Sequence, residues 1–154
     1  MKTLHHDPVV TAEMLIRKPV DEVYEAFVDP AITTKFWFTK SSGRLEKGKQ
    51  VRWEWEMYGA ADDVYVQEME HNAKIRVESS DRTLIEWNFV PRTGNSTFVT
   101  ITTSGFHGNG DDVVNQAIDV MGGYTMVLCG LKAWLEHNIR LNLVADKAPD
   151  AHVT

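Results

Sequence analysis

Residues 111–137 read DDVVNQAIDVMGGYTMVLCGLKAWLEH, and this stretch decides how the rest of the chain can be arranged. Apolar residues recur in it at alternating spacings of three and four, which places them on one side of a long α-helix. They are Val114, Ala117, Met121, Tyr124, Leu128, Leu131 and Leu135. Most of the sequence before this helix has the pattern of short strands. We therefore expect an α+β fold in which a curved antiparallel sheet wraps around one long carboxyl-terminal helix.

The strands are predicted from apolar residues at every second position. The alternation runs through residues 10–16, 51–57 and 85–89. After a turn expected at residues 59–62, further strands are expected at 63–70, 74–79 and 97–103. In two of these segments the buried face carries large aromatic side chains, which are Trp53, Trp55, Trp87 and Phe89. The sheet should therefore turn these rings toward the long helix.

Two short helices are expected after the first strand. Pro19 suits the first turn of a helix because its missing N–H costs no hydrogen bond there. Asp29 precedes Pro30, which disfavours helical angles at Asp29 and should end the first helix. A second helix is predicted from Pro30 toward the adjacent aromatic residues Phe36-Trp37-Phe38. Three adjacent rings cannot all face one way, so at least one should cover the core or border a cavity.

Length and composition indicate one globular domain, residues 1–154, with a core at 10–137 and a tail at 138–154 that frays from Ala145. No apolar run approaches the roughly 18 residues of a membrane span. The amino terminus, with Lys2, His5 and His6, lacks the apolar core of a signal peptide, so we expect a cytoplasmic protein. A net charge of −6 without a dense Lys/Arg cluster argues against nucleic acid as a partner.

Signatures of catalysis and of cofactor binding are missing from the sequence. It contains no Gly-rich phosphate loop after a strand, no nucleophile elbow and no paired metal-ligand spacing, so no cofactor or metal is expected. The segment His5-His6-Asp7 suits only adventitious metal binding. Asp111 or Asp112, near His107, is expected to cap the long helix. The single cysteine, Cys129, is interpreted as a small buried or half-buried side chain.

The inward aromatic residues are the clearest functional signal. They either fill the space between sheet and helix or line a cavity there, since Met and Trp suit walls with irregular gaps. The candidate ligand-binding residues are Trp37, Phe38, Trp53, Trp55, Tyr65, Trp87, Phe89, Met121, Tyr124 and Leu128. The candidate polar groups of such a cavity are Tyr65, Gln67, Thr103 and Tyr124. The alternation assigns no inward carboxylate or histidine, so no general acid or base is evident and a non-catalytic role is favoured.

Small residues and one methionine, all apolar, share a face on the outer side of the long helix. They are Gly123, Met126, Gly130 and Ala133. Such a face can contact a second copy of the chain in a homodimer, or it can seat the tail, and the sequence leaves both open. Gly122 and Gly123 also predict a bend, or the close approach of another group to the helix backbone.

Several segments resemble the SRPBCC superfamily of START-like, helix-grip domains. Residues 16–30, IRKPVDEVYEAFVDP, followed by Phe36-Trp37-Phe38, resemble its opening strand, helix and Trp-Phe signature. Within the superfamily, residues 66–70 and 131–136, with Gly123-Tyr124, are similar to homologues of the heat-shock-protein-90 ATPase activator. The likeness runs from Val10 to His137. It implies a seven-stranded antiparallel sheet that grips the last helix over an apolar cavity, and it is specific for the fold rather than for an activity.

Three functions follow as alternatives. The first is binding of an apolar or amphipathic small molecule, such as a lipid, polyketide or aromatic metabolite, in that cavity. The second is a cyclase- or dehydratase-like enzyme, because similar helix-grip domains of polyketide pathways act on ligands there. The third is a stress-related, chaperone-associated protein. The eukaryotic co-chaperone carries an additional amino-terminal chaperone-binding domain that this chain has no room for, so a chaperone partner is not our leading expectation.

Overall fold

The structure, a computed structural model, describes residues 3–154, and Met1 and Lys2 lie outside the described residues. Seven antiparallel strands form one sheet in the order β1-β7-β6-β5-β4-β3-β2. The strands are β1 (Val10–Ile16), β2 (Lys40–Ser41), β3 (Gln50–Trp55), β4 (Ala60–Glu70), β5 (Lys74–Glu78), β6 (Leu84–Arg92) and β7 (Ser96–Ser104). The helices are α1 (Val20–Val28), α2 (Pro30–Thr33), α3 (Gly110–His137) and α4 (Leu143–Lys147), with single 3₁₀ turns η1 (Glu56–Tyr58) and η2 (Pro149–Ala151). The predicted α+β class is confirmed.

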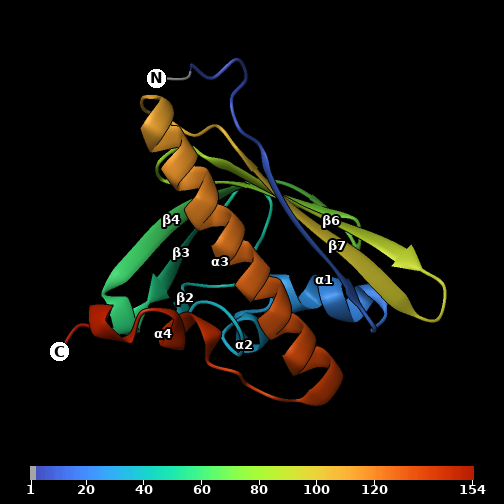
Figure 1. Cartoon of the computed structure of the whole chain (residues 1–154). Coiled ribbons are helices and arrows are strands. Elements are labelled where there is room, and N and C mark those ends of the chain that lie inside the picture. Colours follow the sequence, from blue (N-terminus) through green and yellow to red (C-terminus); the bar gives the residue numbers. More distant parts are fainter. Residues whose placement is uncertain (1–2) are drawn as a thin grey trace.

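The long helix α3 crosses one face of the sheet. Figure 1 shows it running diagonally, with β3 and β4 on one side of it in this view and β6 and β7 on the other. The two short helices follow β1 as predicted, and the Asp29 side chain accepts a hydrogen bond from the Ala31 N–H at the start of α2. The edges of the sheet are β1, which pairs with β7, and β2, which pairs with β3.

The start of α3 is fixed by a reciprocal capping box. The Asn109 side chain accepts a hydrogen bond of 2.9 Å from the Asp112 N–H, and the Asp112 carboxylate accepts one of 3.2 Å from the Asn109 N–H. The cap is therefore Asn109 rather than the expected Asp111 or Asp112, and Asp112 is its reciprocal partner.

In the first half of α3, the residues that face the sheet are not those of the predicted apolar stripe. Val113, Val127, Leu128 and Leu131 are buried, whereas Met121 is 44% exposed and Val114 is 39% exposed. Apolar residues occupy consecutive positions in this half of the helix, so two overlapping stripes about 100° apart satisfy the same helical spacing. The sheet covers the stripe that runs through Val113 rather than the one through Val114.

The tail is ordered, so its predicted fraying is wrong. Asn138 and Asn142 both adopt left-handed backbone angles, with φ of 54° and 56°, and these two turns redirect the chain after α3. The chain then forms α4 and η2, and the Val153 N–H donates a hydrogen bond of 2.8 Å to the Met57 carbonyl. The carboxyl-terminal segment is thereby anchored to η1 at the end of β3.

Within residues 3–154, no helix has both the length and the apolar composition that crossing a membrane requires.

Candidate functional site

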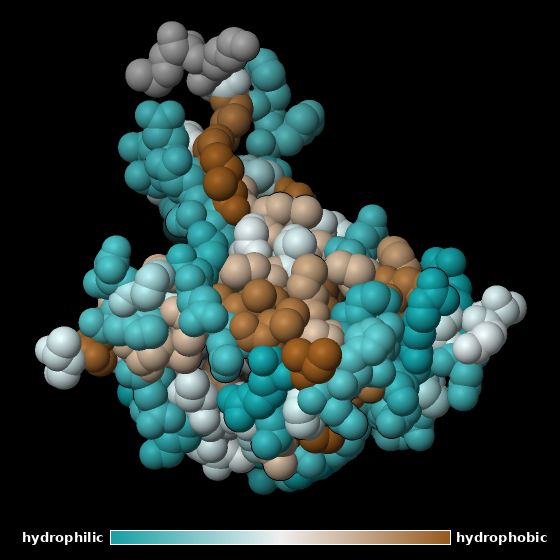
Figure 2. All heavy atoms as spheres, turned by 60° about the horizontal axis from the view of Figure 1, so that its bottom comes forward, coloured by the Kyte–Doolittle hydropathy of each residue, from teal (hydrophilic) through white to brown (hydrophobic). Residues whose placement is uncertain are grey.

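A cavity of about 360 Å³ lies between α3 and the part of the sheet formed by β3, β4 and the start of β6. Strands, η1, α3, α4 and the loop after α2 all contribute to its lining. The residues that border it are Trp37, Trp53, Trp55, Tyr58, Ala60, Asp62, Ile85, Val120, Gly123, Tyr124, Met126, Val127 and Val144. Figure 2, which brings the lower edge of Figure 1 forward, shows apolar and weakly polar side chains in the middle of this face and hydrophilic ones around them.

Trp37 is the centre of the aromatic wall. Its ring centroid lies 4.9 Å from that of Trp53 and 6.2 Å from that of Trp55. The Tyr124 ring meets it edge to face at 5.6 Å. Tilted and edge-to-face contacts at these distances are the favourable arrangements for aromatic pairs, so each ring restrains the others. The wall is therefore built from rings that pack on one another.

The ten predicted site residues fall into three groups. Four of them border the cavity, namely Trp37, Trp53, Trp55 and Tyr124. Four others are buried in the core behind it, namely Phe38, Trp87, Phe89 and Leu128. Phe38 supports the wall from behind because it stacks on Trp53 with centroids 5.2 Å apart and an interplanar angle of 16°.

The last two predicted site residues, Tyr65 and Met121, lie away from the cavity. Tyr65 is 47% exposed, and its neighbours Val64 and Val66 are fully buried. Because successive strand residues face opposite sides of the sheet, Tyr65 points away from α3 and its predicted inward orientation is wrong. Met121 is on the exposed side of α3. Of the other polar candidates, neither Gln67 nor Thr103 borders the cavity.

Asp62 is the functional candidate that the sequence analysis missed. It lies directly opposite Trp53 in the antiparallel β3–β4 pair and borders the cavity. Its carboxylate accepts hydrogen bonds from the hydroxyl groups of Ser79 and Ser80, at 2.5 and 2.6 Å, and from the Ser80 N–H at 3.1 Å. The signal was available, because Asp62 has the same parity along β4 as the buried Val64 and Val66, but a turn was expected over residues 59–62.

Tyr124 is the second polar group of the cavity. Burial raises the pKa of its phenol well above the ordinary value, and the negative charges of Asp62 and Asp81 raise it further. The phenol is therefore neutral at physiological pH. A neutral phenol at a cavity wall can both donate and accept a hydrogen bond.

The tail supplies one end of the cavity through Val144. The Tyr58 hydroxyl donates hydrogen bonds to the carbonyl oxygens of Val144 and, at 3.3 Å, Ala145. The His152 ring packs edge to face on Tyr58 at a centroid distance of 5.3 Å. These contacts hold α4 against η1, so Val144, just before the segment that was expected to fray, is part of the site.

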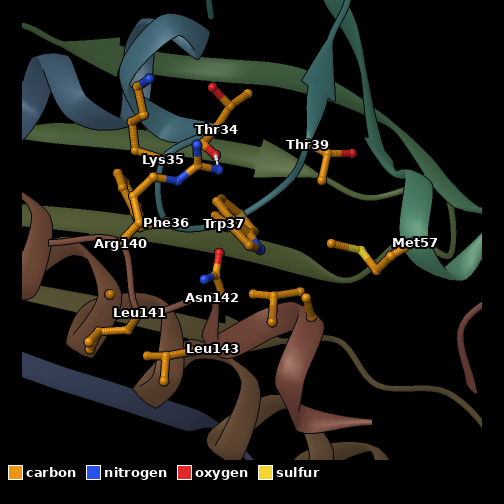
Figure 3. A pocket seen from close by; sticks show the side chains of 13 residues that line it. Thr34, Lys35, Phe36, Trp37, Thr39, Met57, Arg140, Leu141, Asn142 and Leu143 are labelled. Carbon is orange, nitrogen blue, oxygen red and sulfur yellow. Dashed lines mark hydrogen bonds between the residues drawn. The ribbon is translucent and has the colours of Figure 1, made fainter. Parts of the chain in front are cut away.

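A smaller cleft of about 50 Å³ lies on the other side of Trp37. Figure 3 shows Trp37 in its middle, between Arg140 and Asn142 of the tail and Met57 of η1. The Arg140 guanidinium donates a hydrogen bond of 3.5 Å to the Thr34 carbonyl across this cleft. Such a volume holds only a few water molecules, so the cleft is not a second ligand site.

Part of the small-residue face of α3 is covered by the chain itself. Gly123 and Met126 border the cavity. Gly130 is buried against the loop after α2, where a Cβ atom would lie 3.1 Å from the Phe36 Cβ and 3.2 Å from its carbonyl oxygen. Glycine is therefore required at position 130 for the close approach of helix and loop. Of this face, Gly130 is therefore covered by the chain itself, whereas Gly123 and Met126 face the cavity, and a homodimer contact stays a prediction.

Among the residues that the structure describes, no three or more His, Cys, Asp or Glu side chains are grouped so that they could hold a metal ion. Cys129 is half-buried, as predicted.

Comparison with known proteins gives a family and several similar folds. The family model for Activator of Hsp90 ATPase homolog 1-like protein matches residues 17–136. No functionally curated protein matches the chain. The crystal structure of protein SSP2350 from Staphylococcus saprophyticus is similar, with 30% identity and a TM-score of 0.78, over 87% of this chain and 96% of that one.

Two further structures share the fold. The Aha1 dimer from Colwellia psychrerythraea has 20% identity and a TM-score of 0.73, over 84% of this chain and 97% of that one. DynU16, a protein of the dynemicin biosynthetic locus, has 21% identity and a TM-score of 0.76, over 88% of this chain and 49% of that one. At these identities the likeness concerns the fold alone. The ordered tail lies outside the family match, which ends at residue 136.

Proposed function

The chain belongs to the family of Activator of Hsp90 ATPase homolog 1-like proteins, and from that premise we propose that it binds a compact apolar or amphipathic small molecule between α3 and the sheet. The observation that carries the proposal is the cavity of about 360 Å³ bordered by three tryptophans, two tyrosines and one carboxylate. Small-molecule sites are mostly apolar and aromatic, contain a few polar groups, and typically have about 300–1,000 Å³. The cavity is at the small end of that range, which favours an aromatic metabolite or a short-chain compound over a long-chain lipid.

The proposal is tested by screening the purified protein against aromatic, polyketide and lipid compounds by thermal shift and native mass spectrometry. Tryptophan fluorescence supplies an independent signal because Trp37, Trp53 and Trp55 border the cavity. A true ligand should raise the melting temperature, appear at one-to-one stoichiometry and change the fluorescence. A screen without any such compound would contradict the proposal.

Two variants of neighbouring glycines in α3 test whether the ligand binds in this cavity. Gly123 borders it and Gly122 does not, although a Cβ atom at either position would meet no heavy atom within 4 Å. Gly123→Leu should fill part of the cavity and abolish binding. Gly122→Leu makes the same chemical change on the exposed side of α3 and should leave binding intact. Equal effects of both variants would place the ligand elsewhere.

An enzyme of the cyclase or dehydratase kind is a second candidate because Asp62 and Tyr124 give the cavity polar groups that such chemistry requires. The Asp62 carboxylate already accepts three hydrogen bonds, so its partners in the structure are Ser79 and Ser80 and not a group positioned for acid–base chemistry. This candidate therefore ranks below binding. Turnover of a polyketide or aromatic ligand found in the screen, lost in Asp62→Asn, would reverse the order.

The family description suggests a chaperone partner, and the dimeric Aha1 from Colwellia psychrerythraea, together with the small-residue face of α3, suggests a homodimer. Light scattering of the purified chain tests the dimer, and a binding assay with purified Hsp90 tests the chaperone.

A further inference from the structure

We propose that the ligand of this cavity is a cation, with an ammonium group held between the tryptophan faces and the Asp62 carboxylate and a compact apolar body in the rest of the space. The inference rests on the proposed binding function and adds the chemical class of the ligand. It comes from the charge, the aromatic surface and the geometry of the same residues.

The side chains that line the cavity carry negative charge and no positive charge. Asp62 is the only charged side chain among the described residues that border the cavity, and none of those residues is Lys, Arg or His. A ligand carboxylate, as in a fatty acid, would meet a like charge and no cationic partner. A ligand ammonium would meet an opposite charge in a largely apolar site, where electrostatic attraction is stronger than in water.

The aromatic lining favours a cation as well. The face of an indole ring carries negative charge density and attracts ammonium groups more strongly than the face of a phenyl ring does. Trp37, Trp53 and Trp55 all border the cavity, and Tyr124 adds a phenol. Several aromatic rings and one carboxylate in the lining of one cavity are the combination that recognises substituted ammonium groups.

The aromatic rings and the carboxylate lie next to each other on the sheet. Trp53 and Asp62 are cross-strand partners that share one face of the sheet, and the Cβ atoms of such partners are about 4.5–5.5 Å apart. Trp53 itself is only 2% exposed and has one face stacked on Phe38. The half-buried Trp55 pairs with Ala60, two positions from Asp62 on the same face of the sheet, so its ring is a diagonal neighbour within reach of an ammonium group at Asp62.

An ionised carboxylate has about four acceptor sites, and the Ser79 and Ser80 donors occupy three of them. The serines thus orient Asp62 and leave it capacity for one more donor.

The surroundings of Tyr124 agree with a negative potential in the cavity. After burial, the charges of Asp62 and Asp81 are what raise the pKa of its phenol. The chain also carries a net charge of −6, which favours the approach of cations over anions.

The test compares two probes of nearly the same shape, benzyltrimethylammonium and neopentylbenzene, in which a carbon atom replaces the charged nitrogen. Their affinities for the wild-type protein are measured by tryptophan fluorescence, with a thermal shift as a second signal. Benzyltrimethylammonium has no N–H to donate, so the comparison isolates the effect of the positive charge on Asp62 and the indole rings, and we expect the cation to bind about tenfold more tightly or better. Phenylacetate, an anion with the same ring, should not bind.

Asp62→Asn removes the charge and keeps an oxygen acceptor for the serines, so it should erase the preference for the cation. The matched control is Asp63→Asn, one residue further along β4, where the carboxylate pairs with Arg52 at 3.3 Å and is 42% exposed. That variant should keep the preference. The probe comparison uses the wild-type protein and does not depend on how either variant folds.

The outcomes separate this inference from the proposed function. If neopentylbenzene binds as tightly as the cation, the cation inference is overturned and the binding function stands. If neither probe nor any screened compound binds, both are overturned. If Asp62→Asn folds and keeps the preference, the assignment of Asp62 is wrong.

Discussion

Trp53 and Asp62 face each other across the β3–β4 pair, and both border the cavity under α3. A large aromatic ring and a carboxylate are thereby held side by side on a rigid sheet. The polar group of the site therefore depends on strand register, because a shift of one residue would turn Asp62 to the opposite face.

The orientation of α3 can be tested with two core-facing candidates from the same helix. Leu128 is completely buried and Met121 is 44% exposed. Leu128→Ala should lower the free energy of unfolding by about 2–5 kcal/mol because it leaves a cavity in the core. Met121→Ala should change it by less than about 0.5 kcal/mol. Urea unfolding measures both, and a larger effect at Met121 would contradict the orientation described here.

The glycine pair in α3 should be a source of added stability. Each Gly→Ala change in a helix interior is favourable by about 1 kcal/mol if the new methyl group meets no obstacle. Neither Gly122 nor Gly123 has a heavy atom within 4 Å of an added Cβ. Both variants should therefore have higher melting temperatures. A lower melting temperature for either would show that the backbone there needs glycine for a bend.

Loss of the hydrogen bonds between Tyr58 and the tail should destabilise the tail and leave the sheet unaffected. Tyr58→Phe removes the hydroxyl that donates to the Val144 and Ala145 carbonyls, and a hydrogen bond of this kind contributes about 0.5–1.5 kcal/mol. Amide hydrogen exchange should speed up in residues 143–153 and stay unchanged in the central strands. Tyr65→Phe changes an exposed ring on the other face of the sheet and is the control. It should leave amide exchange unchanged both in residues 143–153 and in the central strands.

Acid should weaken the attachment of α3 to the end of β1. Burial works to raise the pKa of Glu136, but hydrogen bonds from the Arg17 N–H at 2.9 Å and the Lys132 ammonium at 2.7 Å, together with the lysine charge, leave that pKa below its ordinary value of 4.5. A carboxyl group with a depressed folded-state pKa stabilises the fold above its unfolded pKa, and the contribution is lost as the pH falls through the folded value.

The free energy of unfolding should therefore decline below about pH 4.5 in the wild type, with a smaller decline in Glu136→Gln. Chemical denaturation at several pH values measures it. Parallel curves for the two proteins would show that Glu136 contributes nothing to the acid sensitivity.

The period-two pattern and the resemblance were enough to predict the sheet, the two short helices and the long helix. They were enough because strand alternation and helix capping act over a few residues. Trp53 and Trp55 were placed in the cavity wall on this basis, and both border it.

The errors in the site have three separate origins. Tyr65 was selected for its residue type although it alternates with the buried Val64 and Val66, so its parity pointed outward. Asp62 was overlooked because a glycine-led segment looked like a turn, whereas β4 begins at Ala60. In α3, consecutive apolar residues left the rotation of the helix undetermined, and only packing against the sheet settles it.

The tail could not be predicted because its order comes from distant contacts. It has no strong periodicity, and its anchors are the Met57 carbonyl and the Tyr58 hydroxyl of η1. Long-range hydrogen bonds of this kind leave no local pattern in the sequence.

The position of β1 at the edge of the sheet has a consequence for how fast the chain acquires its structure. Among residues 3–154 its one strand partner is β7, and the facing residues Thr11 and Thr102 are 91 positions apart. The first strand can dock only after most of the chain has collapsed around it, and topologies rich in such remote pairings refold in roughly milliseconds to seconds rather than microseconds. Until then β7 has an open edge that can pair with another chain, so refolding yields should fall as protein concentration rises.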